Sequence, residues 1–209
     1  MTYRGAVIDT PFESDEVYLP AEDSYLMADC ACSALFDKGG LFDTKETVSV
    51  LEIGCGSGFV SAVLAAQGDR VCVSACDINP AAVALSKKNG VSARLSDMFE
   101  IFGPDDVFDM ILFNPPYLPT ASDEKVPGWL NYAFDGGPSG RETIVRFLDG
   151  VGRHLKPDGF FLLLISSITG RDAVEAEMEK RGFSSCAVGS VKCSFEELIV
   201  LRGEPEHIP

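Results

Sequence analysis

Short apolar runs alternate with helical patterns along most of this 209-residue chain, and this alternation limits the fold more than any other feature. Strand-length runs separated by amphipathic helices are the pattern of consecutive β-α-β units, whose strands pair in parallel. The predicted strands span 48–53, 71–76, 91–95, 107–113, 160–165, 183–188 and 194–201, and the predicted helices span 21–36, 60–67, 80–89, 139–155 and 171–181. The sequence therefore predicts an α/β fold, with an open, mostly parallel seven-stranded sheet and helices on both faces.

Local signals set the ends of several predicted elements. An Asn-Pro pair at 79–80 is typical of a helix start, and residues 139–142 fit a capping box for the long fourth helix. The Lys-Pro-Asp-Gly segment 156–159 is expected to stop that helix. The Gly-Ser pair 189–190 is expected to form the turn of a C-terminal antiparallel hairpin at the edge of the sheet.

The charge of the chain restricts its partners. A net charge of −15, with a sequence pI near 4.4, has the wrong sign for a protein that holds phosphate backbones over a wide face. We therefore expect no extended nucleic-acid binding by this chain alone. Residues 5–37 contain eight acidic residues and no Lys or Arg. This stretch is either a solubilising surface or an acidic rim for a basic partner.

Other features exclude several classes of protein. The longest apolar run, 160–165, is far too short to span a membrane, and the first 20 residues contain no leader-like apolar block. The seven cysteines lack the CxxC spacing of zinc sites, and two histidines are too few for most imidazole metal cages. We expect a cytoplasmic protein with no membrane span and no metal site.

A glycine-rich turn joins the first predicted strand of the sheet to the following helix. It reads Glu52-Ile-Gly54-Cys-Gly56-Ser-Gly58, and its glycines let a ligand approach the backbone closely. The spacing differs from a dinucleotide fingerprint, because that pattern requires glycine where this chain has Phe59. Taken alone, the pattern also fits a simple tight turn. Ligands on open parallel sheets bind where strands end, so the turn favours a nucleotide-type ligand.

Two aspartates follow the next two predicted strands. Asp77 ends the second strand, where a carboxylate is placed to accept hydrogen bonds from ribose hydroxyls. Asp97 follows the third strand and is placed to accept from an adenine amino group, while Met98 packs on the ring. Singly, these residues also fit a helix-start acid and a loop aspartate. Taken together, a glycine-rich turn, Asp77 and Asp97 follow three successive strands, and this order predicts a nucleoside site.

The tetrapeptide Asn114-Pro115-Pro116-Tyr117 follows the fourth predicted strand. Its two prolines stiffen the backbone and remove amide donors, so the loop presents oxygen acceptors. We expect the Asn114 side-chain oxygen and the Pro115 carbonyl to accept both hydrogens of a planar NH2 group, with Tyr117 against its plane. The alternative is a simple Pro-Pro turn after a buried strand. The neighbouring nucleoside site favours the acceptor role over this alternative.

These motifs together resemble the class I S-adenosylmethionine-dependent methyltransferases that act on planar amide or exocyclic amine nitrogens. The stretches Val17–Ser24 and Ala133–Glu142 narrow the resemblance to HemK-related glutamine methyltransferases, which modify the Gly-Gly-Gln loop of translation release factors. The eukaryotic and archaeal branch fits best, because the bacterial proteins carry an extra N-terminal helical domain for which this chain leaves no room. The resemblance implies one Rossmann-like class I methyltransferase domain over 1–209, with segment 1–40 closing over the cofactor site.

The resemblance also carries site residues across to matching positions. It implies that S-adenosyl-L-methionine is bound by Ser24, Glu52, Gly54, Gly56, Asp77, Asp97, Met98 and Asn114. It implies that Asn114, Pro115 and Tyr117 hold the glutamine amide. Ser24 stands where the family more commonly has threonine, and Ser139 where it has asparagine. The first change keeps a hydroxyl and the second keeps a capping group.

A partner is implied as well: a small zinc-binding activator protein that forms a heterodimer with the methyltransferase along a sheet edge. Apolar side chains on the short third strand and just after it offer a surface, namely Val91, Ala93, Leu95, Met98, Phe99, Ile101 and Phe102. These side chains either dock the activator or pack beneath the sheet.

Three alternative functions stay open on the sequence alone. The first is a methyltransferase for an exocyclic amino group of adenine or guanine, because the Asn-Pro-Pro-Tyr loop presents the same acceptors to any planar NH2. The second is a nicotinamide oxidoreductase, and the third is a noncatalytic Rossmann-like binding module. Methyl transfer to a release factor rather than to nucleic acid, and binding of S-adenosylmethionine rather than NAD, separate them.

Overall fold

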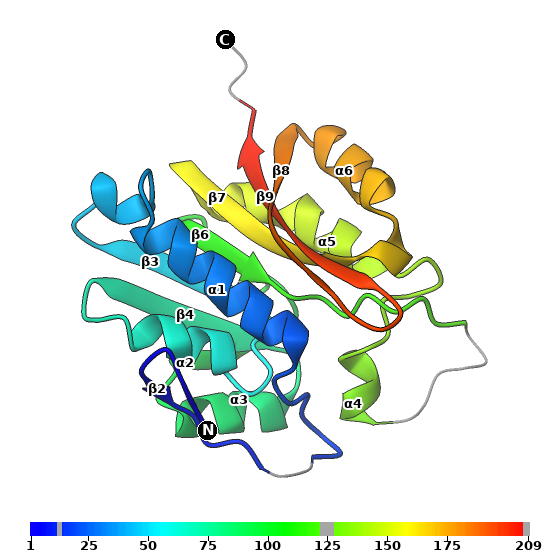
Figure 1. The fold of residues 1–209 in the computed structure, drawn as a ribbon, viewed down its shortest axis with the longest axis horizontal. Helices are drawn as coiled ribbons and strands as arrows, with labels where there is room; N and C mark the ends of the chain where they lie inside the picture. The colour runs from blue at the N-terminus through cyan, green and yellow to red at the C-terminus, as the bar shows by residue number, and fades with distance from the viewer. Residues whose placement is uncertain (12–13, 122–127, 207–209) are drawn as a thin grey trace.

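The computed structural model describes residues 1–11, 14–121 and 128–206. Its centre is a seven-stranded sheet in the order β5-β4-β3-β6-β7-β9-β8. The first five of these strands run parallel, whereas β9 is antiparallel to both β7 and β8 (Figure 1). The strands are β3 (Val48–Ile53), β4 (Val71–Asp77), β5 (Ala93–Leu95), β6 (Phe108–Phe113), β7 (Leu155–Ser166), β8 (Phe183–Lys192) and β9 (Glu197–Pro205). The predicted sheet and its C-terminal hairpin are confirmed.

Helices cover both faces of the sheet. Successive side chains of a strand point to opposite faces, so Val50 and Leu112 join the core beneath α1, whereas Leu51 and Phe113 join the core beneath α5. Figure 1 shows α1 in front of the sheet and α5 behind it. The main helices are α1 (Glu22–Phe36), α2 (Phe59–Ala65), α3 (Pro80–Lys88), α5 (Glu142–Val151) and α6 (Arg171–Glu179). Burial from both sides explains why the central strands are continuous apolar runs.

The order of the strands creates a switch point between β3 and β6. The chain adds β4 and β5 on one side of β3, then returns to place β6 and β7 on the other. Ile53 at the end of β3 pairs with Phe113 at the end of β6. The loops that begin at Gly54 and Asn114 therefore leave neighbouring strand ends, which is where open parallel sheets bind ligands.

The predicted helix over 139–155 is shorter in the structure, and the segment expected to stop it belongs to a strand. α5 ends at Val151, a 3-10 turn follows, and β7 begins at Leu155. Leu155 pairs with Phe108 before a shift in register, and a Cβ on Gly159 would lie 2.8 Å from the Phe108 carbonyl oxygen. Gly159 thus permits close strand contact at an irregular strand start.

The turn predicted at 189–190 is also wrong. β8 continues through Gly189 to Lys192, and the Cys193 amide donates to the Glu196 carbonyl (2.8 Å) at the actual turn. A Cβ on Gly189 would lie 2.5 Å from the sulfur of Cys30 on α1. The glycine therefore serves close helix–strand packing rather than chain reversal.

The start of α3 follows its predicted signal, because the Asn79 side chain accepts from the Ala81 amide (2.9 Å) and caps the helix. The capping box predicted at 139–142 is wrong, since α5 begins at Glu142 with Arg141 as its N-cap and no side-chain cap hydrogen bond. The Ser139 amide does donate to the Glu142 carboxylate (3.2 Å), but Glu142 is the first residue of the helix rather than the third.

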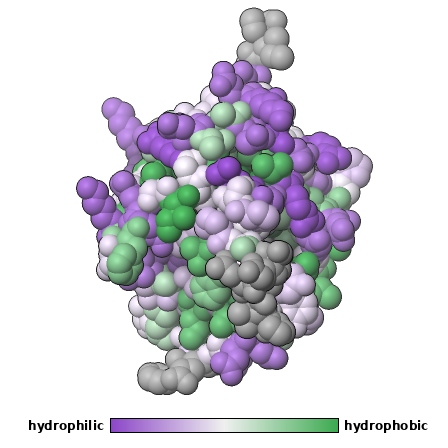
Figure 2. Space-filling view, turned by 90° about the vertical axis from the view of Figure 1, so that its right-hand side faces the viewer, coloured by the Kyte–Doolittle hydropathy of each residue, from purple (hydrophilic) through white to green (hydrophobic). Residues whose placement is uncertain are grey.

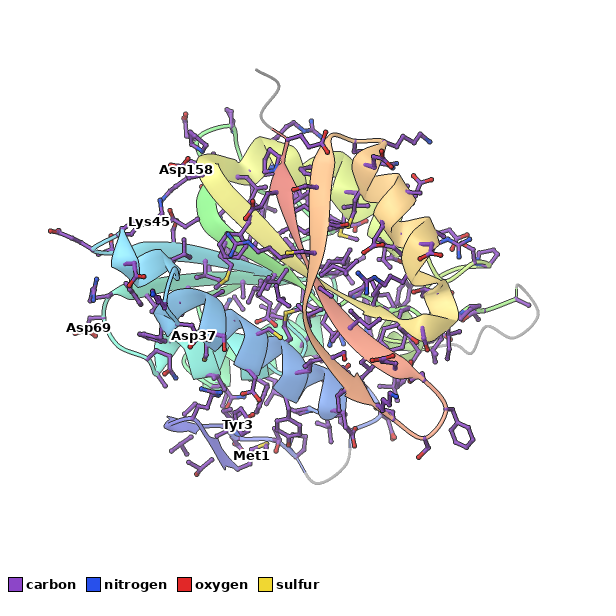
Figure 3. All side chains as sticks on the ribbon, turned by 45° about the horizontal axis from the view of Figure 1, so that its top comes forward. Met1, Tyr3, Asp37, Lys45, Asp69 and Asp158 are labelled. Atoms are coloured by element: carbon purple, nitrogen blue, oxygen red, sulfur yellow. The ribbon has the colours of Figure 1, made fainter. Side chains whose placement is uncertain are left out.

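Short elements that the sequence pattern did not reveal complete the fold: β1 (Thr2–Tyr3), β2 (Ala6–Val7) and α4 (Trp129–Tyr132). The ring centroids of Tyr3, beside α1 in Figure 3, and Phe59 of α2 lie 5.5 Å apart. Across the described ranges, no helix is long and apolar enough to cross a membrane.

Candidate active site

A cavity of about 340 Å³ lies where the parallel strands end. Every residue that the sequence analysis assigned to a site lines this one cavity, namely Ser24, Glu52, Gly54, Gly56, Asp77, Asp97, Met98, Asn114, Pro115 and Tyr117. Figure 2 views the molecule from that side and shows separate hydrophobic patches among hydrophilic residues. The size of the cavity is within the range of small-molecule sites.

The glycine-rich turn forms the floor of the cavity beside β3. Gly58 begins α2 with φ +76°, in the left-handed region that favours glycine. A Cβ there would lie 2.8 Å from the Ser86 hydroxyl oxygen of α3. The turn thus keeps α3 close and leaves its own backbone open to a ligand.

Two buried carboxylates stand at the ends of β3 and β4. Glu52 Oε2 accepts from the Ser61 amide (3.0 Å) and from the Ser61 hydroxyl, and burial raises the pKa of Glu52 to about 8. Asp77 Oδ2 accepts from the Gly56 amide and Oδ1 from the Asn79 amide, each at 2.8 Å, and burial raises the pKa of Asp77. A carboxylate oxygen has two lone pairs, so Asp77 keeps capacity to accept from ligand hydroxyls.

The segment after β5 supplies the opposite end of the cavity. Asp97 Oδ2 accepts from Arg146 Nη2 of α5 at 2.9 Å. Met98 has φ +48°, a left-handed conformation that costs a non-glycine residue about 1–3 kcal/mol. The Ser96 hydroxyl donates to the Met98 carbonyl (3.0 Å) and helps to hold this backbone. Strain of this kind collects at ligand sites, in agreement with the expected position of Met98.

The loop after β6 presents an acceptor without a partner. Asn114 Nδ2 donates to Asp23 Oδ2 at 2.9 Å. Asn114 Oδ1 is buried and accepts no hydrogen bond from the residues that the structure describes. A buried polar atom left in this way costs free energy unless a ligand pairs with it. Burial, followed by the nearby carboxylates of Glu196 and Asp23, raises the pKa of Tyr117 and keeps its hydroxyl protonated.

The stretch Ala133–Glu142 supports this loop from behind. The Leu118 amide donates to the Phe134 carbonyl (3.1 Å), and the Gly136 amide donates back to the Leu118 carbonyl (3.0 Å). Gly140, with φ +73°, packs so closely that a Cβ would lie 2.5 Å from the Tyr117 carbonyl oxygen. These contacts explain why a glycine-rich stretch accompanies the Asn-Pro-Pro-Tyr loop in this sequence.

Among the lining residues that the sequence analysis did not assign to the site are Asp23, Tyr18 and Arg146. Asp23 is 4% exposed, although it lies in the acidic stretch interpreted as a surface or a rim. The position of Asp23 directly before Ser24, at the start of a predicted helix, was the available signal. Arg146 gave no such signal, since its contact with Asp97 joins residues 49 positions apart.

Comparison with known proteins agrees with this geometry. The family model of the methyltransferase small domain matches residues 27–126. A putative protein N5-glutamine methyltransferase of Methanocaldococcus jannaschii is 42% identical over 90% of this chain and 91% of that protein. Methyltransferase HEMK2 of Homo sapiens is 31% identical over 90% of this chain and 89% of the human protein.

The same relationship is visible in three dimensions. A chain in the structure of the E. cuniculi Mtq2–Trm112 complex superimposes with a TM-score of 0.69 and 25% identity, over 91% of this chain and 99% of that one. A parallel sheet with this cavity, glycine-rich turn and acceptor loop defines a methyltransferase. The chain belongs to the family of HemK-related protein N5-glutamine methyltransferases. The resemblance seen in the sequence is confirmed.

Proposed function

We propose that this enzyme methylates the side-chain nitrogen of the glutamine in the Gly-Gly-Gln loop of a eukaryotic-type class 1 translation release factor, with S-adenosyl-L-methionine as methyl donor. The unpaired, buried Asn114 Oδ1 carries the proposal, because a carboxamide NH2 supplies the donor that it lacks. The names of the relatives favour a protein glutamine, and the E. cuniculi complex is described as responsible for methylation of eRF1. Since translation termination takes place in the cytoplasm, the proposal places the protein there.

The residues of the cavity fit the cofactor. Asp77 has lone pairs left for ribose hydroxyls, and Asp97 is placed for an adenine amino group with Met98 against the ring. We assign cofactor binding to Ser24, Glu52, Gly54, Gly56, Asp77, Asp97, Met98 and Asn114. When bound, the cofactor supplies a methyl group already activated by a positively charged sulfur. Segment 1–40 closes over it in this proposal, which is supported by the position of Tyr18 in the cavity wall.

The acceptor loop holds and orients the glutamine nitrogen. Asn114 Oδ1 and the Pro115 carbonyl accept its two hydrogens, and Tyr117 packs against the amide plane. These bonds strengthen as the nitrogen gains positive charge, so they favour the transition state over the ground state. No general base is required, because a proton leaves readily once the nitrogen is alkylated.

An activator protein is part of the proposal, and β5 at the edge of the sheet is its docking strand. Leu95 and Ile101 are 54% and 38% exposed there. Val91, Ala93 and Phe102 are buried, so only part of the apolar cluster is free for a partner. Trm112 in the E. cuniculi complex supports a partner of this kind, and zinc binding by the partner rests on the sequence resemblance.

Mass spectrometry of a methylated release factor tests the function. The release factor is incubated with this chain, its candidate activator and labelled cofactor. We expect one methyl group on the glutamine of the Gly-Gly-Gln loop and none on a Gln→Ala control substrate. Labelling of RNA or DNA but not of the release factor contradicts the proposal and selects the nucleic-acid alternative.

A further inference from the structure

The first turn of α1 contributes a buried carboxylate that belongs to no assigned role. Asp23 is 4% exposed, and its Oδ1 accepts from the Ser24 amide (2.6 Å) and the Ser24 hydroxyl (3.1 Å). Its Oδ2 accepts from Asn114 Nδ2 at 2.9 Å, a contact between residues 91 positions apart. Burying a carboxylate is costly unless it is hydrogen-bonded, and these three hydrogen bonds offset that cost and fix the side chain in place.

The chemistry of this contact fixes the orientation of Asn114. The two ends of a carboxamide have nearly the same shape, and only the hydrogen-bond partner decides which end points where. An ionised carboxylate accepts hydrogen bonds and donates none. Asp23 therefore holds the NH2 end of Asn114, and the oxygen end is left as the buried, unpaired acceptor.

We propose that Asp23 is a positioning residue of the acceptor site, which holds Asn114 with its oxygen turned toward the substrate carboxamide. This inference rests on the proposed function and deepens it. With the amide reversed, Asn114 would present NH2 to the NH2 of the substrate, donor against donor. The negative charge of Asp23 also polarises the Asn114 amide and strengthens its oxygen as an acceptor.

The variant Asp23→Asn tests the orientation at constant shape, because an asparagine at this position accepts or donates and no longer dictates the orientation of Asn114. We expect kcat on a Gly-Gly-Gln peptide to fall about 10- to 100-fold, the range for a hydrogen bond to a charged group. The affinity for S-adenosylmethionine, measured by calorimetry, should stay within threefold. Asp29→Asn is the matched control: Asp29 lies on the same helix, pairs with Arg4 and does not line the cavity. It should leave kcat unchanged.

An exchange of the two groups separates positioning from a structural role. Asn114→Asp alone places two carboxylates against each other and should be less active than Asp23→Asn. The double variant Asp23→Asn with Asn114→Asp restores one donor–acceptor bond and leaves a carboxylate oxygen toward the substrate. We expect it to exceed Asn114→Asp in kcat by at least tenfold, with thermal stability near that of the wild type.

Two results would overturn the inference: unchanged kcat in Asp23→Asn, or a double variant no faster than Asn114→Asp. If Asp23→Asn does not fold, the comparison between Asn114→Asp and the double variant decides alone. A wild-type enzyme that methylates no Gly-Gly-Gln glutamine contradicts the proposed function instead, so the two failures are distinguishable.

Discussion

At the two ends of the parallel sheet, the pKa values of buried carboxyl groups are shifted in opposite directions. Where the strands begin, Asp109 on β6 is 1% exposed, and where they end, Glu52 on β3 is 4% exposed. Burial alone would raise the pKa of Asp109, but hydrogen bonds from Lys156, Ser49 and Lys45 lower it to about 2. Glu52 has only Ser61 as its hydrogen-bond donor in the described chain, and its pKa rises to about 8.

Both side chains are almost hidden from solvent, but Glu52 lies deeper and has no cationic partner, whereas Asp109 has two. Lys156 Nζ lies 2.7 Å from Asp109 Oδ2 and Lys45 Nζ lies 3.0 Å from Oδ1 (Figure 3 labels Lys45 at this edge). We call this the complete end, because each oxygen of its carboxylate lies within ion-pair distance of a lysine, although Oδ1, like Asn114 Oδ1, accepts no well-aligned hydrogen bond from the described residues. The other end, which we call the incomplete end, has a Glu52 whose pKa is raised and an Asn114 Oδ1 without a partner among the described residues. In the proposed function, a bound ligand supplies the missing donor.

The largest expected effect is at the incomplete end. Asn114→Ala removes the acceptor and should lower turnover of the release factor at least about 1000-fold, the upper range for removing one transition-state hydrogen bond. Cofactor affinity should remain within several-fold. The unfolding midpoint should fall only modestly, because Asp23 Oδ2 loses its Asn114 donor while the unpaired Oδ1 is removed as well. Steady-state methylation, calorimetry and urea unfolding measure the three quantities. Retained turnover would count directly against the assignment of the site.

The next effect is at the complete end. Asp109→Asn leaves two lysines without their carboxylate and should lower the free energy of unfolding by about 2–3 kcal/mol at neutral pH. Turnover by the folded enzyme should not change, because Asp109 lies near the amino end of β6 and the cavity lies at the carboxyl ends of the strands. Urea unfolding followed by circular dichroism gives the free energy. An unchanged midpoint would show that the pair contributes nothing.

The two carboxylates should also give pH dependences of opposite sign. Asp109 titrates near 2 in the folded state against a reference of 3.8, so its stabilisation is present above about pH 4 and is lost as the pH falls toward 2. Glu52 titrates near 8 against 4.5, so its contribution is present at low pH and is lost as the pH rises from about 4.5 to about 8.

Glu52→Gln should therefore flatten the stability of the ligand-free protein between about pH 5 and about pH 8, and Asp109→Asn should not. Unfolding free energies of both variants and of the wild type at these two pH values provide the check. Parallel curves for Glu52→Gln and the wild type would contradict the raised pKa of Glu52.

The smallest expected effect tests how much each of the two lysines contributes to pairing with Asp109. Lys45→Met removes one of two lysines, and Lys156 and Ser49 still pair with Asp109. A loss of about 0.5 kcal/mol is expected, because a partly exposed lysine contributes little when another cation remains. A loss as large as that of Asp109→Asn would mean that Lys45, rather than the pair of lysines, holds the carboxylate.

Periodicity in the sequence predicts most of this fold, and two of its errors share a cause. The order of the main helices and strands was predicted correctly, because apolar residues recur at helix or strand spacing within each of them. Gly189 and Gly159 were read as local breaks in the chain, whereas each is a glycine because another segment packs against it. Contacts between distant segments leave no local signal.

The same distinction holds for the site. Asp77, Asp97 and Asn114 were predictable, because the carboxyl ends of parallel strands lie together and each residue is at the end of a strand or within two residues of it. Asp23 and Arg146 lie on helices. Asp23 contacts Asn114, 91 positions away in the sequence, and Arg146 contacts Asp97, 49 positions away. Site residues at strand ends can be predicted from the sequence, whereas the helix residues that hydrogen-bond to them cannot.

Acidic side chains outnumber basic ones in the described wall of the cavity, and under the proposed function this bears on the release of product. The described part of the wall contains Glu16, Asp23, Glu52, Asp77, Asp97 and Asp135, with Arg146 as its one basic side chain. In the proposed reaction, the ionised carboxylates among them attract a cationic methyl donor and lose that attraction once the charge has left with the methyl group. We therefore expect the cavity to bind the methyl donor more tightly than the used cofactor, and added salt should reduce the difference in affinity.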